Sequence, residues 1–257
     1  MNLDLNTKAL NTWCPGCTNF LILAAFKNAL TELINEGKIK KDNIVVGAGI
    51  GCHGKIADYI NVNSIISLHG RVVPTMTGVK LANPDLTVVA FSGDGDSYAE
   101  GMEHLVHASK RNTDIKLFVH NNQVFGLTTG QVTPTSKKGY RGKSTPEGSV
   151  EEPVNPSLVM LASGATFVAR AYTGDMTFMT LMMKKAILHK GFAHLEIIQP
   201  CISFNDTRDY FKDNVYQLDS NLPKNDLKWA MEKVQEKEKI PVGIFYDIDK
   251  PTFEEQL

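Results

Sequence analysis

Short β-branched runs that alternate with amphipathic stretches constrain the fold of this chain more than any other feature. Six runs have the composition of buried strands, at residues 43–49, 64–70, 86–93, 115–121, 165–172 and 193–200. Stretches with apolar residues at helical spacing lie before or between them, at 21–34, 98–109, 156–163 and 177–188. Strands that alternate with helices predict an α/β fold, in which helices cover both faces of a parallel sheet.

The chain has 257 residues and shows no internal repeat or linker, so we expect a single domain over residues 1–257. Residues 126–156 are rich in Gly, Thr, Lys, Ser and Pro. A loop of that length inside a compact domain is usually functional or disordered. Residues from about 202 to 257 are polar and charged, and they are predicted to form a helical tail packed on the main domain.

Composition excludes several classes of partner and location. The formal net charge is −1, which gives no reason to expect nucleic acid or an anionic membrane surface as a partner. No apolar run approaches the ~18 residues that span a bilayer. The first residues lack a basic segment followed by an apolar stretch, so no secretory signal is visible. We therefore expect a cytoplasmic protein with no nucleic-acid or membrane partner.

One motif lies at the carboxyl end of a predicted strand, where open α/β sheets bind ligands. The segment FSGDGDSYAEG, residues 91–101, follows a buried run and precedes a helical pattern. Gly93 and Gly95 allow the backbone to approach a phosphate closely, but Asp94 between them would repel the same anion. That conflict disappears if a Mg²⁺ ion stands between carboxylate and phosphate. A lone Gly-Asp-Gly also occurs in ordinary turns, so a second ligand is needed.

The neighbouring strand end supplies that second ligand. The segment VHNNQVFGLT, residues 119–128, follows the next predicted strand, and Asn122 within it offers a neutral amide oxygen. A turn at Gln123 and Val124 adds a backbone carbonyl. The order strand, Gly-Asp-Gly, helix, strand, Asn-Asn therefore predicts a site for Mg²⁺ and a diphosphate.

The four cysteines indicate a metal site. Cys14 and Cys17 form a C-x-x-C pair in NTWCPGC, and Cys52 and Cys201 are the other two. Four cysteines in a chain this long do not make a disulfide-stapled domain. Four thiolates suit either a [4Fe–4S] cluster or a structural zinc, and ligand softness does not separate the two metals. Cys52 follows a strand end, close to the predicted cofactor, and a redox centre has a use for that position whereas a structural zinc does not.

Together these motifs resemble the β subunits of 2-oxoacid:ferredoxin oxidoreductases. The likeness runs from Trp13 to about Cys201, in the segments WCPGC, GIGCHGK, LHGR, VKLANPDLTVVAFSGDGD, HNNQVFGLTTGQ and IIQPC. The Gly-Asp-Gly and Asn-Asn pair resembles the thiamine diphosphate motif that transketolases and decarboxylases share with this family. The resemblance implies a thiamine diphosphate-binding fold, a Mg²⁺ ion and one [4Fe–4S] cluster. The implied cluster ligands are Cys14, Cys17, Cys52 and Cys201, and the implied magnesium ligands are Asp94, Asn122 and Val124.

The resemblance also implies individual contact residues. Coenzyme contacts are expected at Ile50, Gly51, Cys52, His53, His69, Gly95, Asp96, Gly126 and Leu127. Lys55, His69 and Leu127 are expected at the catalytic centre, where Lys55 would bind the distal carboxylate of a dicarboxylic 2-oxoacid. A surface or capping role for His69 and a solvated Lys55 remain the alternatives.

The implied reaction is the oxidative decarboxylation of a 2-oxoacid to an acyl-coenzyme A, with electrons leaving through the cluster to ferredoxin. 2-Oxoglutarate is the favoured substrate, and pyruvate and branched-chain 2-oxoacids stay open. No glutamate in the sequence can be assigned to coenzyme activation, so the resemblance implies a heterodimer with an α, or fused α/γ, subunit that supplies it. The sequence leaves open whether the loop 129–156 covers the site or contacts this partner. The alternatives are a non-oxidative thiamine diphosphate-dependent decarboxylase subunit and a zinc-stabilised binding module without enzyme activity.

Overall fold

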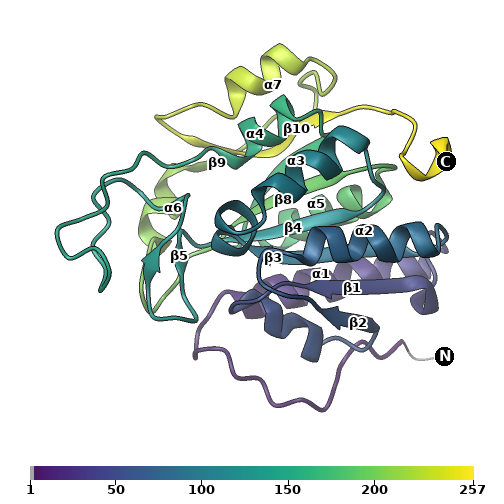
Figure 1. Ribbon diagram of the computed structural model, residues 1–257, viewed down its shortest axis with the longest axis horizontal. Coiled ribbons are helices and arrows are strands. Elements are labelled where there is room, and N and C mark those ends of the chain that lie inside the picture. The colour runs from purple at the N-terminus through teal and green to yellow at the C-terminus, as the bar shows by residue number, and fades with distance from the viewer. Residues whose placement is uncertain (1–2) are drawn as a thin grey trace.

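An eight-stranded, mostly parallel sheet forms the centre of the structure, a computed structural model that describes residues 3–257 (Figure 1). In spatial order its strands are β2 (Asn63–Ile66), β1 (Ile44–Ala48), β3 (Thr87–Gly93), β4 (Lys116–Asn121), β8 (Ala193–Ile198), β7 (Phe167–Tyr172), β10 (Ile240–Asp247) and β9 (Val215–Gln217). Neighbouring strands are parallel except for β10 and β7, which pair antiparallel. The predicted α/β fold with a parallel sheet is confirmed, apart from this one pairing.

Helices cover both faces of the sheet, as the sequence predicts (Figure 1). The first face carries α1 (Asn19–Asn35) and α5 (Met176–Leu188). The second face carries α2 (Val72–Ala82), α3 (Met102–Arg111), α4 (Pro156–Ala162) and α7 (Leu227–Lys233). Within residues 3–257, none of these helices is both long and apolar enough to cross a membrane.

The strands have two apolar faces because successive side chains point to opposite sides of the sheet. Val46 and Phe91 pack with α1 on the first face, whereas Val45 packs under α2 on the second. Phe26 of α1 meets the edge of Phe91 with ring centroids 4.9 Å apart, and both side chains are fully buried. Burial of one such side chain stabilises the fold by roughly 1.5–3 kcal/mol, so this interface fixes α1 on the sheet.

The predicted helix at 98–109 is interrupted where it meets the end of β3. Residues Gly95–Ala99 form a single π-helical turn, and α3 begins at Met102 after a break at Gly101. A Cβ atom on Gly101 would lie 2.6 Å from the carbonyl oxygen of Gly70, so only glycine permits this approach of the two loops. The turn leaves Asp94 at the carboxyl end of β3.

The C-terminal segment differs from the predicted helical tail. It holds α6 (Arg208–Asn214) and α7, but also β9 and β10, and β10 joins the main sheet beside β7. Residues 241–245 of β10 are all buried, so this short run completes the core. The prediction of a purely helical tail is wrong, because a five-residue apolar run inside a charged segment gives only a weak strand signal.

Hydrogen bonds attach the C-terminal residues of the chain near the amino-terminal end of β4. Asn112 Nδ2 donates to the carbonyl oxygens of Lys250 and Pro251, 3.1 Å from each. The amide of Asp114 donates to the carboxylate of Glu254, whose residue lies in the short helix Glu254–Gln256. Because β4 begins at Lys116, this attachment lies at the amino-terminal ends of the parallel strands, opposite the carboxyl ends of β1, β3 and β4.

Candidate functional site

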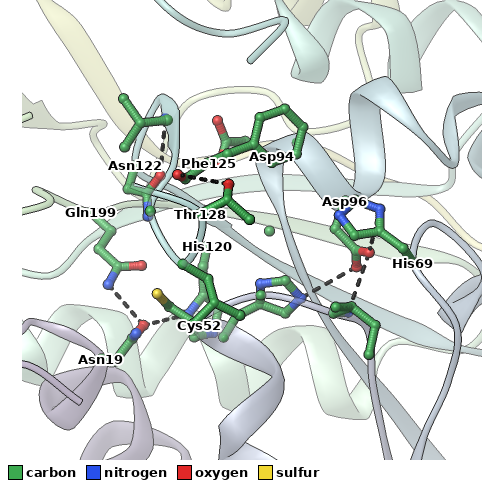
Figure 2. Close-up of a pocket in the computed structure, with 18 residues that line it drawn as sticks. Asn19, Cys52, His69, Asp94, Asp96, His120, Asn122, Phe125, Thr128 and Gln199 are labelled. Carbon is green, nitrogen blue, oxygen red and sulfur yellow. Dashed lines mark hydrogen bonds and ion pairs between the residues drawn. The ribbon is translucent and has the colours of Figure 1, made fainter. Parts of the chain in front are cut away.

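A pocket lies at the carboxyl ends of β1, β3 and β4, where the sequence predicts a diphosphate site (Figure 2). Twelve residues expected to contact a coenzyme or magnesium line it: Ile50, Gly51, Cys52, His53, His69, Asp94, Gly95, Asp96, Asn122, Val124, Gly126 and Leu127. Lys55 and three of the cysteines do not line it. The structure thus brings the expected residues together from the segments that follow β1, β2, β3 and β4, while their contacts with a coenzyme stay a prediction.

Asp94 is a buried carboxylate, and one of its two oxygens already accepts hydrogen bonds from this chain. Its Oδ2 accepts hydrogen bonds from Thr133 Oγ1 at 2.6 Å and from Thr135 Oγ1 at 2.7 Å. Burial raises the pKa of Asp94 to about 6, although both hydroxyl bonds oppose the rise. A buried anion without a positive partner is costly, so this site favours a bound cation.

The Thr133 and Thr135 contacts come from the loop after the small hairpin of β5 (Val124–Phe125) and β6 (Gln131–Val132). Sequence reasoning missed both threonines, because this loop has no periodicity and no motif that points to Asp94. Part of the long loop 126–156 therefore supports the predicted magnesium ligand directly.

A tight turn holds the second predicted magnesium ligand. Gln123 has a φ of 63°, in the left-handed region, and Asn122 Oδ1 accepts from the amide of Val124 at 3.0 Å. Ser136 Oγ donates to the carbonyl oxygen of Gln123, and Asn205 Nδ2 donates to that of Asn122. The amide oxygen of Asn122 retains one lone pair, so a hard cation can still bind it.

Asp96, in the segment after β3, contacts the loops that follow β1 and β2 at the pocket. Oδ2 accepts from Ser92 Oγ at 2.6 Å, and Oδ1 accepts from the amide of Gly70 at 2.7 Å. His53 Nε2 lies 3.3 Å from the carboxylate. His69 Nδ1 lies 3.5 Å from it, and Figure 2 shows His69 beside Asp96. Burial alone would raise the pKa of Asp96, but His53, Ser92 and the Gly70 amide hold it below its usual value. Both histidines thus turn one ring nitrogen toward the Asp96 carboxylate at ion-pair distance.

Of the predicted catalytic residues, Leu127 lies at the opening of the pocket and Lys55 lies outside it. Leu127 is 48% exposed, which leaves a large apolar side chain uncovered at the opening. Lys55 follows His53 in the short helix His53–Asp58, and its Nζ donates to the carbonyl oxygen of Thr12 at 3.1 Å. The ammonium group therefore faces the loop before Cys14 instead of the pocket.

The four cysteines gather beside the pocket. A Cβ atom on Gly126 would lie 3.6 Å from Cys52 Sγ and 3.7 Å from Cys201 Sγ, so these two thiols flank one glycine. Burial, together with the charges of Cys17, Cys201 and Cys14, raises the pKa of Cys52 to about 11, although the charge of Lys55 opposes the rise. All four are free thiols.

The loops that carry Cys14 and Cys201 are linked by contacts within this chain. Thr18 Oγ1 donates to the carbonyl oxygen of Pro200 at 3.2 Å, and Ser203 Oγ lies 3.6 Å from Cys14 Sγ. Among residues 3–257, no three His, Cys, Asp or Glu side chains already form a metal-binding group. The thiols are therefore neighbours in a common region, and their arrangement around a metal stays a prediction.

A buried polar chain connects Asp94, the expected magnesium ligand, to Arg170 in β7. Thr135 Oγ1 lies 2.9 Å from Asn121 Oδ1 as well as 2.7 Å from Asp94 Oδ2, so these two oxygens share its single proton. Asn121 Nδ2 donates to Glu196 Oε1 at 2.8 Å. Arg170 Nε donates to Glu196 Oε2, also at 2.8 Å, and both side chains are buried. Burial would raise the pKa of Glu196, but the Arg170 guanidinium holds it below its usual value.

We expect Glu196→Ala to lower the free energy of unfolding by about 3–5 kcal/mol, because it leaves the Arg170 guanidinium buried without a partner. Urea denaturation of the purified chain measures this loss. Glu232→Ala is the matched control, since Glu232 is exposed and its contact with Lys228 is 4.0 Å long; it should cost less than about 1 kcal/mol. Equal losses in the two variants would contradict the buried-pair account.

Comparison with known proteins gives matches over almost the entire chain. Residues 49–197 match the family model for the C-terminal TPP binding domain of thiamine pyrophosphate enzymes, and residues 201–257 match that for the C-terminal part of the pyruvate ferredoxin oxidoreductase beta subunit. The 2-oxoacid:ferredoxin oxidoreductase subunit beta of a Sulfolobus species is 40% identical over 98% of this chain and 87% of its own length. The 2-oxoglutarate synthase subunit KorB of Methanocaldococcus jannaschii is 35% identical over 95% of this chain and 90% of its own.

A solved structure shows the same fold. It is the 2-oxoglutarate:ferredoxin oxidoreductase from Magnetococcus marinus with 2-oxoglutarate, coenzyme A and succinyl-CoA bound. The two structures agree with a TM-score of 0.94 at 34% sequence identity, over 98% of this chain and 86% of the other.

Proposed function

This chain belongs to the family of 2-oxoacid:ferredoxin oxidoreductase β subunits, and from that premise we propose that it takes part in the CoA-dependent oxidative decarboxylation of 2-oxoglutarate. Family membership, the thiamine diphosphate-binding fold and the oxidoreductase class confirm the resemblance read from the sequence. The substrate, the coenzyme contacts, the cluster and the partner are part of the proposal.

One observation carries the redox part of the proposal. A Cβ atom on Gly126 would lie within 3.7 Å of the Asn122 amide and of the Cys52 and Cys201 sulfur atoms. The expected magnesium ligand and two expected cluster ligands therefore share a single neighbour. A non-oxidative decarboxylase has no use for thiols beside its coenzyme, and a zinc-stabilised binding module has no use for the pocket.

The residues present fit a magnesium-held thiamine diphosphate. Asp94, Asn122 and the carbonyl oxygen of Val124 would hold Mg²⁺, because the buried Asp94 carboxylate favours a cation and the other two offer neutral hard oxygens. A Cβ atom on Gly95 would lie 2.2 Å from the Phe125 ring, so glycine keeps the backbone and this ring close at the expected diphosphate position. When bound, the coenzyme supplies the electron sink for the loss of CO₂.

The four thiols fit an iron–sulfur cluster by number and by neighbourhood. Cys14, Cys17, Cys52 and Cys201 would hold it, and this chain contains no fifth cysteine. When bound, a [4Fe–4S] cluster supplies transfer of one electron at a time, here to a ferredoxin as the external carrier.

The pocket also supports the proposal of a partner subunit. Its lining includes Asp94 and Asp96 as carboxylates but no glutamate, and both aspartates already make contacts inside this chain. Ile50 is 39% exposed and Leu127 is 48% exposed at the pocket, which suits an apolar surface completed by another chain. An α subunit in a cytoplasmic heterodimer would cover these residues and supply the activating glutamate.

This chain's own residues would position the reactants. Asp96 fixes His53 and His69 at the pocket wall, and His69 is placed to donate to an anionic oxygen there. Phe125 and Leu127 would exclude water from the coenzyme once the partner closes the opening.

Lys55 remains our candidate for the distal carboxylate, and to reach it the ammonium must leave the Thr12 carbonyl. Lys55→Ala should raise the KM for 2-oxoglutarate about tenfold or more, because a charged hydrogen bond contributes roughly 1.5–3 kcal/mol, while the KM for pyruvate changes little. Steady-state kinetics of the assembled enzyme measure both constants. Lys8→Ala, at an exposed position, is the control. Equal effects on the two substrates would remove Lys55 from substrate recognition.

Turnover by the chain co-purified with its partner tests the whole proposal. Reduction of ferredoxin should require CoA and a 2-oxoacid, with 2-oxoglutarate preferred over pyruvate and branched-chain 2-oxoacids. The isolated chain should reduce no viologen with any of them. CO₂ release without electron transfer would favour a non-oxidative decarboxylase, and one zinc per chain without iron or coenzyme binding would favour the binding module.

A further inference from the structure

Three buried polar side chains meet where the cysteine-bearing loops approach the pocket. Asn19 opens α1 two residues after Cys17, and Gln199 lies two residues before Cys201. His120, in β4, lies beside Asn19, on the other side from Gln199 (Figure 2). The exposed fractions of Asn19, His120 and Gln199 are 1%, 2% and 2%, so no surface role explains them.

Asn19 joins the other two side chains through one oxygen. Its Oδ1 accepts from His120 Nδ1 at 2.8 Å and from Gln199 Nε2 at 2.8 Å (Figure 2). An oxygen that only accepts requires His120 to carry its proton on Nδ1, and this leaves a lone pair on Nε2. The sequence gives no spacing signal for this cluster, because its members are 101 and 180 residues apart from Asn19 along the chain.

Two acceptor atoms of this three-residue group have no hydrogen-bond donor. His120 Nε2 and Gln199 Oε1 are buried without a hydrogen-bond partner among the described residues, and both residues line the coenzyme pocket. An unsatisfied buried acceptor costs about 1–3 kcal/mol, which a donor bound in the pocket would offset. Carboxylate and keto oxygens only accept hydrogen bonds, so this part of the pocket disfavours them and favours a hydroxyl, an amino group or a water molecule.

We propose that Asn19, His120 and Gln199 form a clamp that holds the Cys17 and Cys201 loops together, while His120 and Gln199 present an acceptor pair for a hydroxyl, amino or water donor in the pocket. This inference rests on the proposed function, since it places the three residues beside the expected ligands of the iron–sulfur cluster and in the coenzyme pocket of that enzyme. His120 is a positioning residue in the clamp, where it acts through Asn19. Its two nitrogen atoms therefore have separable roles.

A pair of substitutions separates the two nitrogen atoms. In His120→Asn, the side-chain amide can still donate to Asn19 from near the Nδ1 position, but the pocket atom is lost. In His120→Gln, the longer amide reaches the position of Nε2 and loses the bond to Asn19. His107→Asn, at an exposed position on α3, is the matched control.

The first measurement is the rate at which an iron chelator removes iron from the full chain, reconstituted anaerobically with iron and sulfide. We expect about tenfold faster loss in His120→Gln than in wild type, and a near-normal rate in His120→Asn. Asn19→Leu breaks both clamp bonds without altering β4, and it should lose iron at least as fast as His120→Gln. Thermal unfolding of each variant excludes a general loss of fold.

The second measurement is kcat/KM for 2-oxoglutarate and for CoA in the enzyme assembled with its partner. His120→Asn should lower one or both values about tenfold while it keeps the iron and its electron paramagnetic resonance spectrum. Equal behaviour of the two His120 variants in both measurements would overturn the clamp. A wild-type chain that takes up no iron would instead refute the proposed function itself, so the two failures are distinguishable.

Discussion

Asp94→Asn is expected to raise the Kd for thiamine diphosphate and Mg²⁺ by about two to three powers of ten, and to lower turnover accordingly. The buried Asp94 carboxylate has both threonine hydroxyls on Oδ2, and its charge is the only one offered to the cation by the three expected ligands. Removal of one partner from a buried charge pair typically costs about 3–5 kcal/mol. Calorimetric titration with the coenzyme and Mg²⁺ measures the change.

Asp85→Asn is the matched control, because Asp85 is exposed in the loop before β3. It should bind the coenzyme as wild type does. If Asp94→Asn also bound normally, the magnesium site would have to be placed elsewhere.

The same substitution should stabilise the coenzyme-free chain. Burial raises the pKa of Asp94 from 3.8 to about 6, so the folded state holds this proton more tightly than the unfolded state does. The resulting stability is fully present below about pH 4 and is lost as the pH rises through 6. At pH 7.5 the uncharged asparagine avoids this loss, and the free energy of unfolding should rise by roughly 3 kcal/mol.

Denaturation of the coenzyme-free chain across pH checks the sign. The gain from Asp94→Asn should vanish near pH 4, where wild-type Asp94 is already protonated. A variant less stable than wild type at pH 7.5 would show that the ionised carboxylate is compensated by groups of this chain alone.

Cys201→Ser is expected to lower ferredoxin-linked turnover by at least about 100-fold. Loss of a ligand should exceed the 10–100-fold effect that is typical for groups that merely support a ligand. Cys201 lies with Cys52 and Asn122 beside Gly126, so this substitution would remove one of the two expected cluster ligands beside the expected magnesium site. Iron and acid-labile sulfide analysis of anaerobically purified protein gives a readout independent of activity.

Ser203→Ala serves as the control in the same loop, because it removes the weak hydroxyl contact with Cys14 Sγ but no thiol. It should retain iron and turnover. Full activity of Cys201→Ser, or a wild-type chain with zinc in place of iron, would contradict the redox centre.

The fold could be predicted where local pattern and long-range packing agree. Buried β-branched runs such as 86–93 became strands because both faces of the sheet are covered. β10 was missed since its apolar run lies between charged residues, and its antiparallel pairing with β7 depends on the edge left free there. A single sequence carries little signal for such a pairing.

The candidate site divides in the same way. Asp94 and Asn122 could be found because each directly follows a strand, and Cys52 because it lies in the loop after β1; strand order then brings the three together. Thr135 and the Asn19, His120 and Gln199 clamp could not, because their bonds join segments between 14 and 180 residues apart. Whether polar side chains so far apart will meet is decided by the folded backbone, which no local motif reports.

The attachment of the last residues to Asn112 and Asp114 has a practical consequence. It keeps the C-terminal residues at the amino-terminal ends of the strands, remote from the pocket and the thiols, and Leu257 itself is 83% exposed. A tether joined after Leu257 would therefore immobilise the protein on an electrode or sensor surface with the pocket turned toward the solution.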